Sequence, residues 1–125
     1  MSLPTDSTTR KHIPMARGLL DYFPDALAEV AYVSHCSNEK HNPGEPLHWS
    51  KEKSSDHADC LVRHIVERGT VDPDDGLRHS AKAAWRALAL LVREVADGST
   101  AGLEMLRASL GAKPLPKRVA LKLAS

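Results

Sequence analysis

Apolar residues recur three or four positions apart over three stretches of the chain, a spacing that is typical of amphipathic helices. The first predicted helix covers residues 24–38, because Pro24 suits the first helical position. The second covers residues 54–68, since a serine such as Ser54 suits an N-cap and Gly69 suits a C-terminal stop. The residues of this second helix expected to face the core are Ala58, Leu61, Val62 and Ile65.

The third predicted helix covers residues 77–97 and follows an acidic turn. Asp72 is expected to cap it, with Pro73 at the first helical position and Asp75 in the first turn. Apolar residues recur along it in alternating steps of four and three, which predicts a continuous packing seam. The seam consists of Leu77, Ala81, Ala84, Leu88, Leu91 and Val95. A shorter helix is expected over residues 101–110.

These patterns predict an all-α fold, a compact bundle of three main helices and a short C-terminal one. A chain of 125 residues is long enough for one modest core. Residues 1–12 are polar and are expected to form a flexible arm, residues 13–112 the helical domain, and residues 113–125 a basic tail. Because the alanines of the seam permit close approach of helices, we expect a homo-oligomer.

Charge and hydropathy narrow the partners and the compartment. The formal net charge is +1, so the composition indicates no affinity for nucleic acid polymers or acidic membranes. No stretch approaches the ~20 apolar residues of a membrane span, and none resembles a signal sequence. Two isolated cysteines, Cys36 and Cys60, make no disulfide framework. We therefore expect a reduced, cytoplasmic location.

Most of the ionisable groups that could do chemistry lie between positions 56 and 91. The acidic turn holds more carboxylates than capping requires, so Asp72 and Asp75 are predicted ligands for Mg²⁺ or Mn²⁺, which prefer hard oxygen donors. Asp59 or Glu29, from the helices, would add a further carboxylate. Helix capping alone explains any single aspartate of the turn. The spacing patterns of strong zinc sites are missing. The conceivable zinc ligands are His57, Cys60 and His64.

A basic stripe on the third predicted helix includes Lys82 and Arg86. Such a stripe is usually solvated surface, but it becomes a phosphate clamp if it faces the second helix, because guanidinium groups match phosphate oxygens. The irregular loop of residues 41–49 ends in His48 and Trp49. A buried tryptophan that anchors the loop is one interpretation. An aromatic wall for a nucleobase, with polar His48 beside it, is the other.

The order of motifs resembles a family of small phage and prophage proteins, the dATP/dGTP diphosphohydrolase N-terminal domain family, which is related to the MazG-like pyrophosphohydrolases. The matching segments, within residues 19–94, are LLDYFPDALAEVAYV, EKHNPGEPLHW, the Arg63–His64 pair, DPDDGLRH and AKAAWRALALL. The resemblance implies a compact helical domain that acts on purine (deoxy)nucleoside triphosphates. It also implies a location in the cytoplasm of a bacterial host cell. It implies a site that includes Lys40, Trp49, Arg63, His64, Asp72 and His79.

The leading hypothesis is hydrolysis of such nucleotides to monophosphate and pyrophosphate. His64 or His79 would orient or deprotonate the attacking water, since histidine titrates near neutral pH. The phosphate charge would be neutralised by Arg63, Lys82 and Arg86. The alternative is a binding protein that sequesters a nucleotide or nucleotide-derived signal without breaking it. A third possibility is a structural helical module whose charges are all surface pairs.

Overall fold

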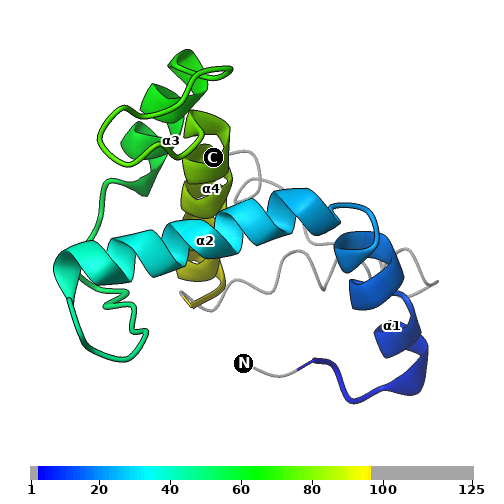
Figure 1. Ribbon diagram of the computed structural model, residues 1–125. Helices are drawn as coiled ribbons and strands as arrows, with labels where there is room; N and C mark the ends of the chain where they lie inside the picture. Colours follow the sequence, from blue (N-terminus) through cyan, green and yellow to red (C-terminus); the bar gives the residue numbers. More distant parts are fainter. Residues whose placement is uncertain (1–2, 97–125) are drawn as a thin grey trace. The chain divides into compact units, whose positions relative to one another are not determined.

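The computed structural model describes residues 3–96 and is all-α over that range, as predicted (Figure 1). The predicted helix at 101–110 and the tail at 113–125 lie outside the described residues. Residues 23–93 form one compact unit, and the described residues on either side belong to a second. The helical elements in chain order are α1 (Ser7–Lys11), η1 (Ala16–Leu20), α2 (Pro24–His41), α3 (His57–Val66) and α4 (His79–Ala96).

The short helix α1 occupies part of the segment that was expected to be a flexible arm. The carboxylate of Asp6 accepts a hydrogen bond of 2.8 Å from the backbone N–H of Thr9, which satisfies one of the free donors at the start of a helix. Arg10 and Lys11 place positive charge in the last turn, at the negative end of the helix dipole. η1, which follows, is a single π-helical turn.

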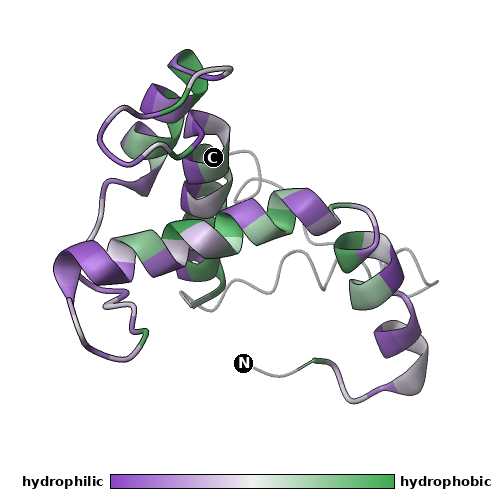
Figure 2. Cartoon of the chain, viewed as in Figure 1, coloured by the Kyte–Doolittle hydropathy of each residue, from purple (hydrophilic) through white to green (hydrophobic). Residues whose placement is uncertain are grey.

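The helix α2 begins at the predicted Pro24 but continues to His41, three residues beyond the predicted end at position 38. Asn42 ends it, and its backbone N–H bonds to the carbonyl of Asn38. Hydrophobic and hydrophilic residues alternate along α2 in Figure 2, so this helix lacks one broad apolar face. Its contacts with the rest of the unit therefore depend on individual side chains.

The helix α3 is shorter at both ends than the predicted helix of residues 54–68. A serine was expected to cap it, but Asp56 precedes its first residue, and the carbonyl of Ser54 accepts a hydrogen bond from Arg93 of α4 instead. The chain leaves the helix after Val66. Gly69 then adopts φ +85°, a left-handed conformation that favours glycine, as expected for a stop.

The acidic segment before α4 forms a closed turn, so the prediction that Asp72 caps this helix is wrong. The backbone N–H of Asp72 donates to the carbonyl of Leu77 at 2.7 Å, and Val71 pairs with Arg78 in an isolated antiparallel bridge. The Asp72 carboxylate accepts from the backbone N–H of Asp74 within the turn. These bonds commit the segment to the turn, and the helix begins two residues later than expected, at His79.

The buried residues of the unit differ from the predicted core. Val62 is 60% exposed and Ile65 45%, although both were expected to face inward from α3. Most of the predicted seam on α4 is exposed as well, including Leu88 at 50% and Leu91 at 53%. The buried side chains of the unit instead are Val33, Asn38, His57, Cys60, His79, Ala81, Ala83 and Ala89. The reason is that the polar flank of α3, rather than its apolar flank, lies against α4.

Among residues 3–96, every helix is too short or too polar to span a bilayer.

Candidate functional site

The helices α3 and α4 run side by side (Figure 1) and meet through polar side chains. Three contacts join α3, or the segment just before it, to α4. Residue numbers rise along the first segment while those of the partners on α4 fall, so the two helices are antiparallel. The paired residues are Ser54 with Arg93, His57 with Arg86 and His64 with His79. An interface built from imidazole and guanidinium groups is unusual, because burying polar groups costs free energy unless each is hydrogen-bonded.

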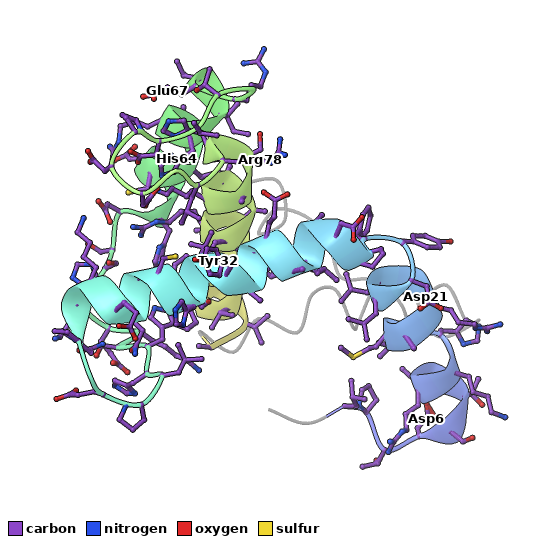
Figure 3. The ribbon with its side chains drawn as sticks, viewed as in Figure 1. Asp6, Asp21, Tyr32, His64, Glu67 and Arg78 are labelled. Carbon is purple, nitrogen blue, oxygen red and sulfur yellow. The ribbon has the colours of Figure 1, made fainter. Side chains whose placement is uncertain are left out.

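A chain of three ionisable residues lies at the end of this interface near the turn. Nδ1 of His64 lies 3.0 Å from Nδ1 of His79, and Nε2 of His79 lies 3.0 Å from a carboxylate oxygen of Glu67. Figure 3 labels His64 and Glu67 at the same end of the unit. The carboxylate only accepts hydrogen bonds, so Nε2 of His79 carries a hydrogen. In the neutral pair, Nδ1 of His79 then accepts from Nδ1–H of His64. Nε2 of His64 therefore keeps its lone pair and can act as a base.

The surroundings of His64 favour its neutral form. Partial burial lowers the pKa of His64 from its ordinary value of 6.5, and the nearby His79, Lys82 and Arg86 lower it further. Asp72 opposes them but does not reverse the shift. His64 is consequently unprotonated at neutral pH, and the same cations that lower its pKa are placed to attract an anionic ligand.

A second cluster of polar groups surrounds His57, whose side chain is buried at 2% exposure. Arg86 donates to its Nδ1 at 3.0 Å, so the remaining hydrogen is on Nε2, which has no hydrogen-bond partner among the described residues. Burial lowers the pKa of His57, and the charges of Arg86 and Arg93 lower it further. This imidazole is therefore neutral and carries one unpaired donor.

Arg63 and Arg86 keep donor capacity that no hydrogen bond described among residues 3–96 uses. Arg63 donates one hydrogen bond, at 3.0 Å, to the sulfur of Cys60, and Cys60 in turn donates to the carboxylate of Asp56 at 3.4 Å. The hydrogen bond from Cys60 lowers the pKa of Asp56, and both arginines contribute to this through their charge. Because each guanidinium has five N–H donors and its direct partner is neutral, both can also bind phosphate oxygens.

Lys82 holds the acidic turn against α4. Its ammonium group lies 2.8 Å from a carboxylate oxygen of Asp72 and 2.7 Å from one of Asp75, and its side chain is only 16% exposed. Partial burial alone would lower the pKa of Lys82, but its hydrogen bonds with the two carboxylates raise it overall. The hydrogen bond from Lys82 is also the main cause of the lowered pKa of Asp72. Two of the three ammonium donors are thus used, and one remains.

The described side chains do not fit the predicted magnesium site. Asp72 and Asp75 lie together, as expected, but both bind Lys82, which neutralises the carboxylates that a cation would need. Asp59, the third predicted ligand, is exposed on α3 with no contact to them. Among residues 3–96, no group of three or more His, Cys, Asp or Glu side chains is placed to hold a metal ion. Zinc binding by His57, Cys60 and His64 would compete with the hydrogen bonds that these residues already make.

The loop between α2 and α3 is held by the buried Asn38. Its amide nitrogen donates to the carbonyl of Glu45 at 3.0 Å, and its amide oxygen accepts from the backbone N–H of His48 at 3.1 Å. These bonds fix the loop that carries Trp49. The ring of Trp49 lies edge-on to that of Trp85 on α4, with 5.2 Å between centroids.

The predicted site residues on α2 and in the loop after it lie apart from those on α3 and α4. Trp49 is half-buried against another tryptophan, as the anchoring interpretation expects, and Lys51 lies over its ring. Nε2 of His48 lies 3.4 Å from the hydroxyl of Ser50. Lys40 is exposed in the last turn of α2. The structure shows no contact of Trp49, His48 or Lys40 with the cluster around His64, which consists of His64, Glu67, His79 and Lys82.

The structure also contains interacting residues that were not singled out from the sequence. Glu67 orients His79, and Asp56 lies beside the two arginines. One signal for Glu67 was present, because it follows His64 by three positions, at the C-terminal end of α3. Nothing local pointed to the pairing of His57 with Arg86, because these residues are 29 positions apart.

Comparison with known proteins agrees with this arrangement of motifs. The family model described as "dATP/dGTP diphosphohydrolase, N-terminal" matches residues 5–101, which is more than half of the chain. No curated protein and no solved structure matches the chain. The match includes all of the described α-helices and every residue of the cluster around His64. The chain therefore belongs to the dATP/dGTP diphosphohydrolase N-terminal family.

Proposed function

We propose that the chain hydrolyses purine deoxynucleoside triphosphates to monophosphate and pyrophosphate at the polar interface of α3 and α4. The observation that carries this proposal is the hydrogen-bonded chain of Glu67, His79 and His64. It supplies an oriented, unprotonated base beside several cations, which is what attack of water on a phosphate ester requires. The family description supports the substrate class.

In this reaction Nε2 of His64 takes a proton from water, and the water oxygen forms a bond with the α-phosphorus. The bond between that phosphorus and the oxygen bridging to the β-phosphate breaks, and pyrophosphate leaves with the bonding electron pair. The His64 imidazolium donates its Nδ1–H to His79, whose own Nε2–H donates to Glu67. The negative carboxylate stabilises the positive charge that develops along the chain.

The phosphate groups would be bound by side chains that retain free donors. Lys82 has one unused N–H, and Arg63 and Arg86 each use one donor on a neutral partner. Charge-assisted hydrogen bonds to phosphate are stronger than neutral ones, so they offset the loss of hydration when the ligand binds. No step in this scheme passes through a protein-bound metal ion, because the described donor set does not fit one.

Capture of a nucleotide without hydrolysis is the second candidate function. It is favoured by the ion pairs of Lys82, because Lys82 binds Asp72 and Asp75, the two carboxylates that could have held a divalent cation. A binding protein needs only the cationic side chains, and the family description concerns the N-terminal part of a diphosphohydrolase. The two functions predict opposite fates for the ligand.

The deciding experiment incubates the purified chain with each of the four deoxynucleoside triphosphates, with and without Mg²⁺ or Mn²⁺. Chromatography then follows nucleotide and product before and after heat denaturation of the protein. Conversion of dATP and dGTP to monophosphate, lost in His64→Gln and retained in the control His12→Gln, supports hydrolysis. Nucleotide that disappears and returns intact on denaturation supports capture. Nucleotide that stays free throughout contradicts both.

A further inference from the structure

A groove of about 380 Å³ lies between α2 and the start of α4, on residues that the proposed hydrolysis does not use. Its apolar lining comes from Val71, Leu77 and Ala81. Gly76 adds bare backbone, so a flat ligand can approach the main chain closely there. Apolar concavities with a few polar groups at the edge are the usual form of small-molecule sites.

The polar edge of the groove consists of an acid and a base that pair with one another. The guanidinium of Arg78 lies 2.9 Å from the carboxylate of Glu29, and the two side chains are 69% and 48% exposed. An ion pair this exposed is weakly held, because water and salt screen it. A ligand that offers both a donor and an acceptor can therefore replace the pairing at little cost.

Tyr32 adds an aromatic ring to the same edge. It is 55% exposed, although it lies beside an apolar lining, and its ring stacks on that of His35 with 5.6 Å between centroids. The neighbouring side chain of Cys36 raises the pKa of Tyr32. Figure 3 labels Tyr32 on α2 and Arg78 at the beginning of α4. An oriented, exposed ring next to an apolar floor is a platform on which a base can stack.

We propose that this groove binds the purine base of the nucleotide, with Tyr32 as the stacking surface and Glu29 and Arg78 as the groups that recognise the base edge. The inference rests on the proposed function, whose substrate it locates. On adenine, the exocyclic amine donates, which suits Glu29, and the adjacent N7 accepts, which suits Arg78. On guanine, N1–H and the exocyclic amine donate, which suits Glu29, and the adjacent O6 accepts, which suits Arg78. Pyrimidines lack N7 and present a smaller surface for stacking.

The groove adjoins the phosphate-binding side chains along α4. Arg78 immediately precedes His79, and Ala81 immediately precedes Lys82. Consecutive residues of a helix point about 100° apart, so the groove and the cluster around His64 occupy neighbouring faces of its first turn. A single nucleotide can thus place its base on one face and its phosphates on the other. Trp49, for which base stacking was one of two interpretations from the sequence, is packed against Trp85.

The test separates the two halves of the nucleotide. Deoxyguanosine and deoxyadenosine probe the groove without phosphates, inorganic tripolyphosphate probes the cationic cluster without a base, and deoxycytidine is the control ligand. Binding to the full chain is measured by ¹H–¹⁵N NMR titration. We expect the purine nucleosides to shift the amide resonances of Gly76 and Leu77, and deoxycytidine to bind at least about tenfold more weakly.

The variants Tyr32→Ala and Glu29→Gln should each weaken purine nucleoside binding about tenfold or more, because stacking and a charge-assisted hydrogen bond are worth that much. Both should leave tripolyphosphate binding unchanged. Asp25→Asn is the matched control, since it removes an exposed carboxylate from the same helix away from the groove.

The outcomes distinguish this inference from the proposed function. Purine nucleosides that bind at Gly76 while dGTP is never hydrolysed would support the groove and contradict hydrolysis. Hydrolysis of dGTP with an unchanged KM in both Tyr32→Ala and Glu29→Gln would overturn the groove and leave the proposed function standing. Equal binding of deoxycytidine and the purine nucleosides would also overturn it.

Discussion

Replacing the buried pair of His57 and Arg86 by apolar residues should stabilise the protein and remove its ligand binding. The change is the double variant His57→Leu with Arg86→Met. His57 is 2% exposed, and its Nε2–H has no partner among the described residues. A buried donor of this kind costs about 1–3 kcal/mol of folding free energy. The double substitution removes the unpaired donor and the charge that faces it.

The net effect follows from what else the pair contributes. The guanidinium of Arg86 lies over the ring of Trp85, 5.6 Å from its centroid, and losing this contact costs ~0.5 kcal/mol. Subtracting it leaves an expected gain of about 0.5–2.5 kcal/mol for the double variant, and each kcal/mol corresponds to about 5 °C in Tm. Arg86→Met alone leaves a second nitrogen of His57 unpaired and should destabilise by about 1–3 kcal/mol.

The assay is urea unfolding followed by circular dichroism for the wild type, both single variants and the double variant, which form a thermodynamic cycle. Nucleotide binding is measured on the same samples. A more stable double variant that no longer binds dGTP would show that the polar interface is retained for its ligand. A double variant less stable than the wild type would refute the reasoning, because the pair would then be a structural element of the fold.

Three further predictions concern stability and assembly. The pKa values of His57 and His64 are both lowered on folding, so the unfolded state binds protons more readily. The free energy of unfolding should therefore be highest above pH 6.5 and decrease as the pH falls below that value. Urea unfolding at a series of pH values measures it, and a free energy that stays constant between about pH 7 and 5 would contradict this. Asn38→Ala removes two anchors of the loop before α3 and should cost about 2–3 kcal/mol, whereas an unchanged unfolding midpoint would show that the loop is held elsewhere. Leu88→Glu places a charge on the exposed seam of α4, and light scattering should then report a lower mass than for the wild type; a wild-type mass at the monomer value would contradict the expected oligomer.

The helices could be predicted from the sequence because their signals are local. Apolar spacing located α2, α3 and α4, and Pro24 marked the start of α2 correctly. Gly69 adopts the expected left-handed conformation, although α3 already ends at Val66. The orientation of α3 could not be predicted in this way. Periodicity showed which residues share a face, but the apolar flank with Val62 was assumed to face inward. The opposite flank is inside because His57 meets a partner 29 residues away, and such pairings leave no local pattern.

In the candidate site, the sequence likewise identified individual residues but not their partners. His64, His79 and Lys82 were recognised by their chemistry, and the structure places them close together. Asp72 was misassigned as a helix cap because the local signal for capping is strong, whereas its actual partner is ten residues further on. Glu67 was overlooked for a similar reason, since its carboxylate resembles one of several surface charges on α3 until its contact with His79 is known.

The most direct test of the central claim is the rate of pyrophosphate release from dGTP as a function of pH, in the wild type and in His64→Gln. Because the pKa of His64 is lowered, the wild-type rate should increase with pH, reach half of its maximum below pH 6.5 and be constant around neutral pH. His64→Gln should lower this plateau by about a hundredfold. A wild-type rate of pyrophosphate release in His64→Gln, or complete recovery of intact dGTP from the wild type at every pH, would contradict the account.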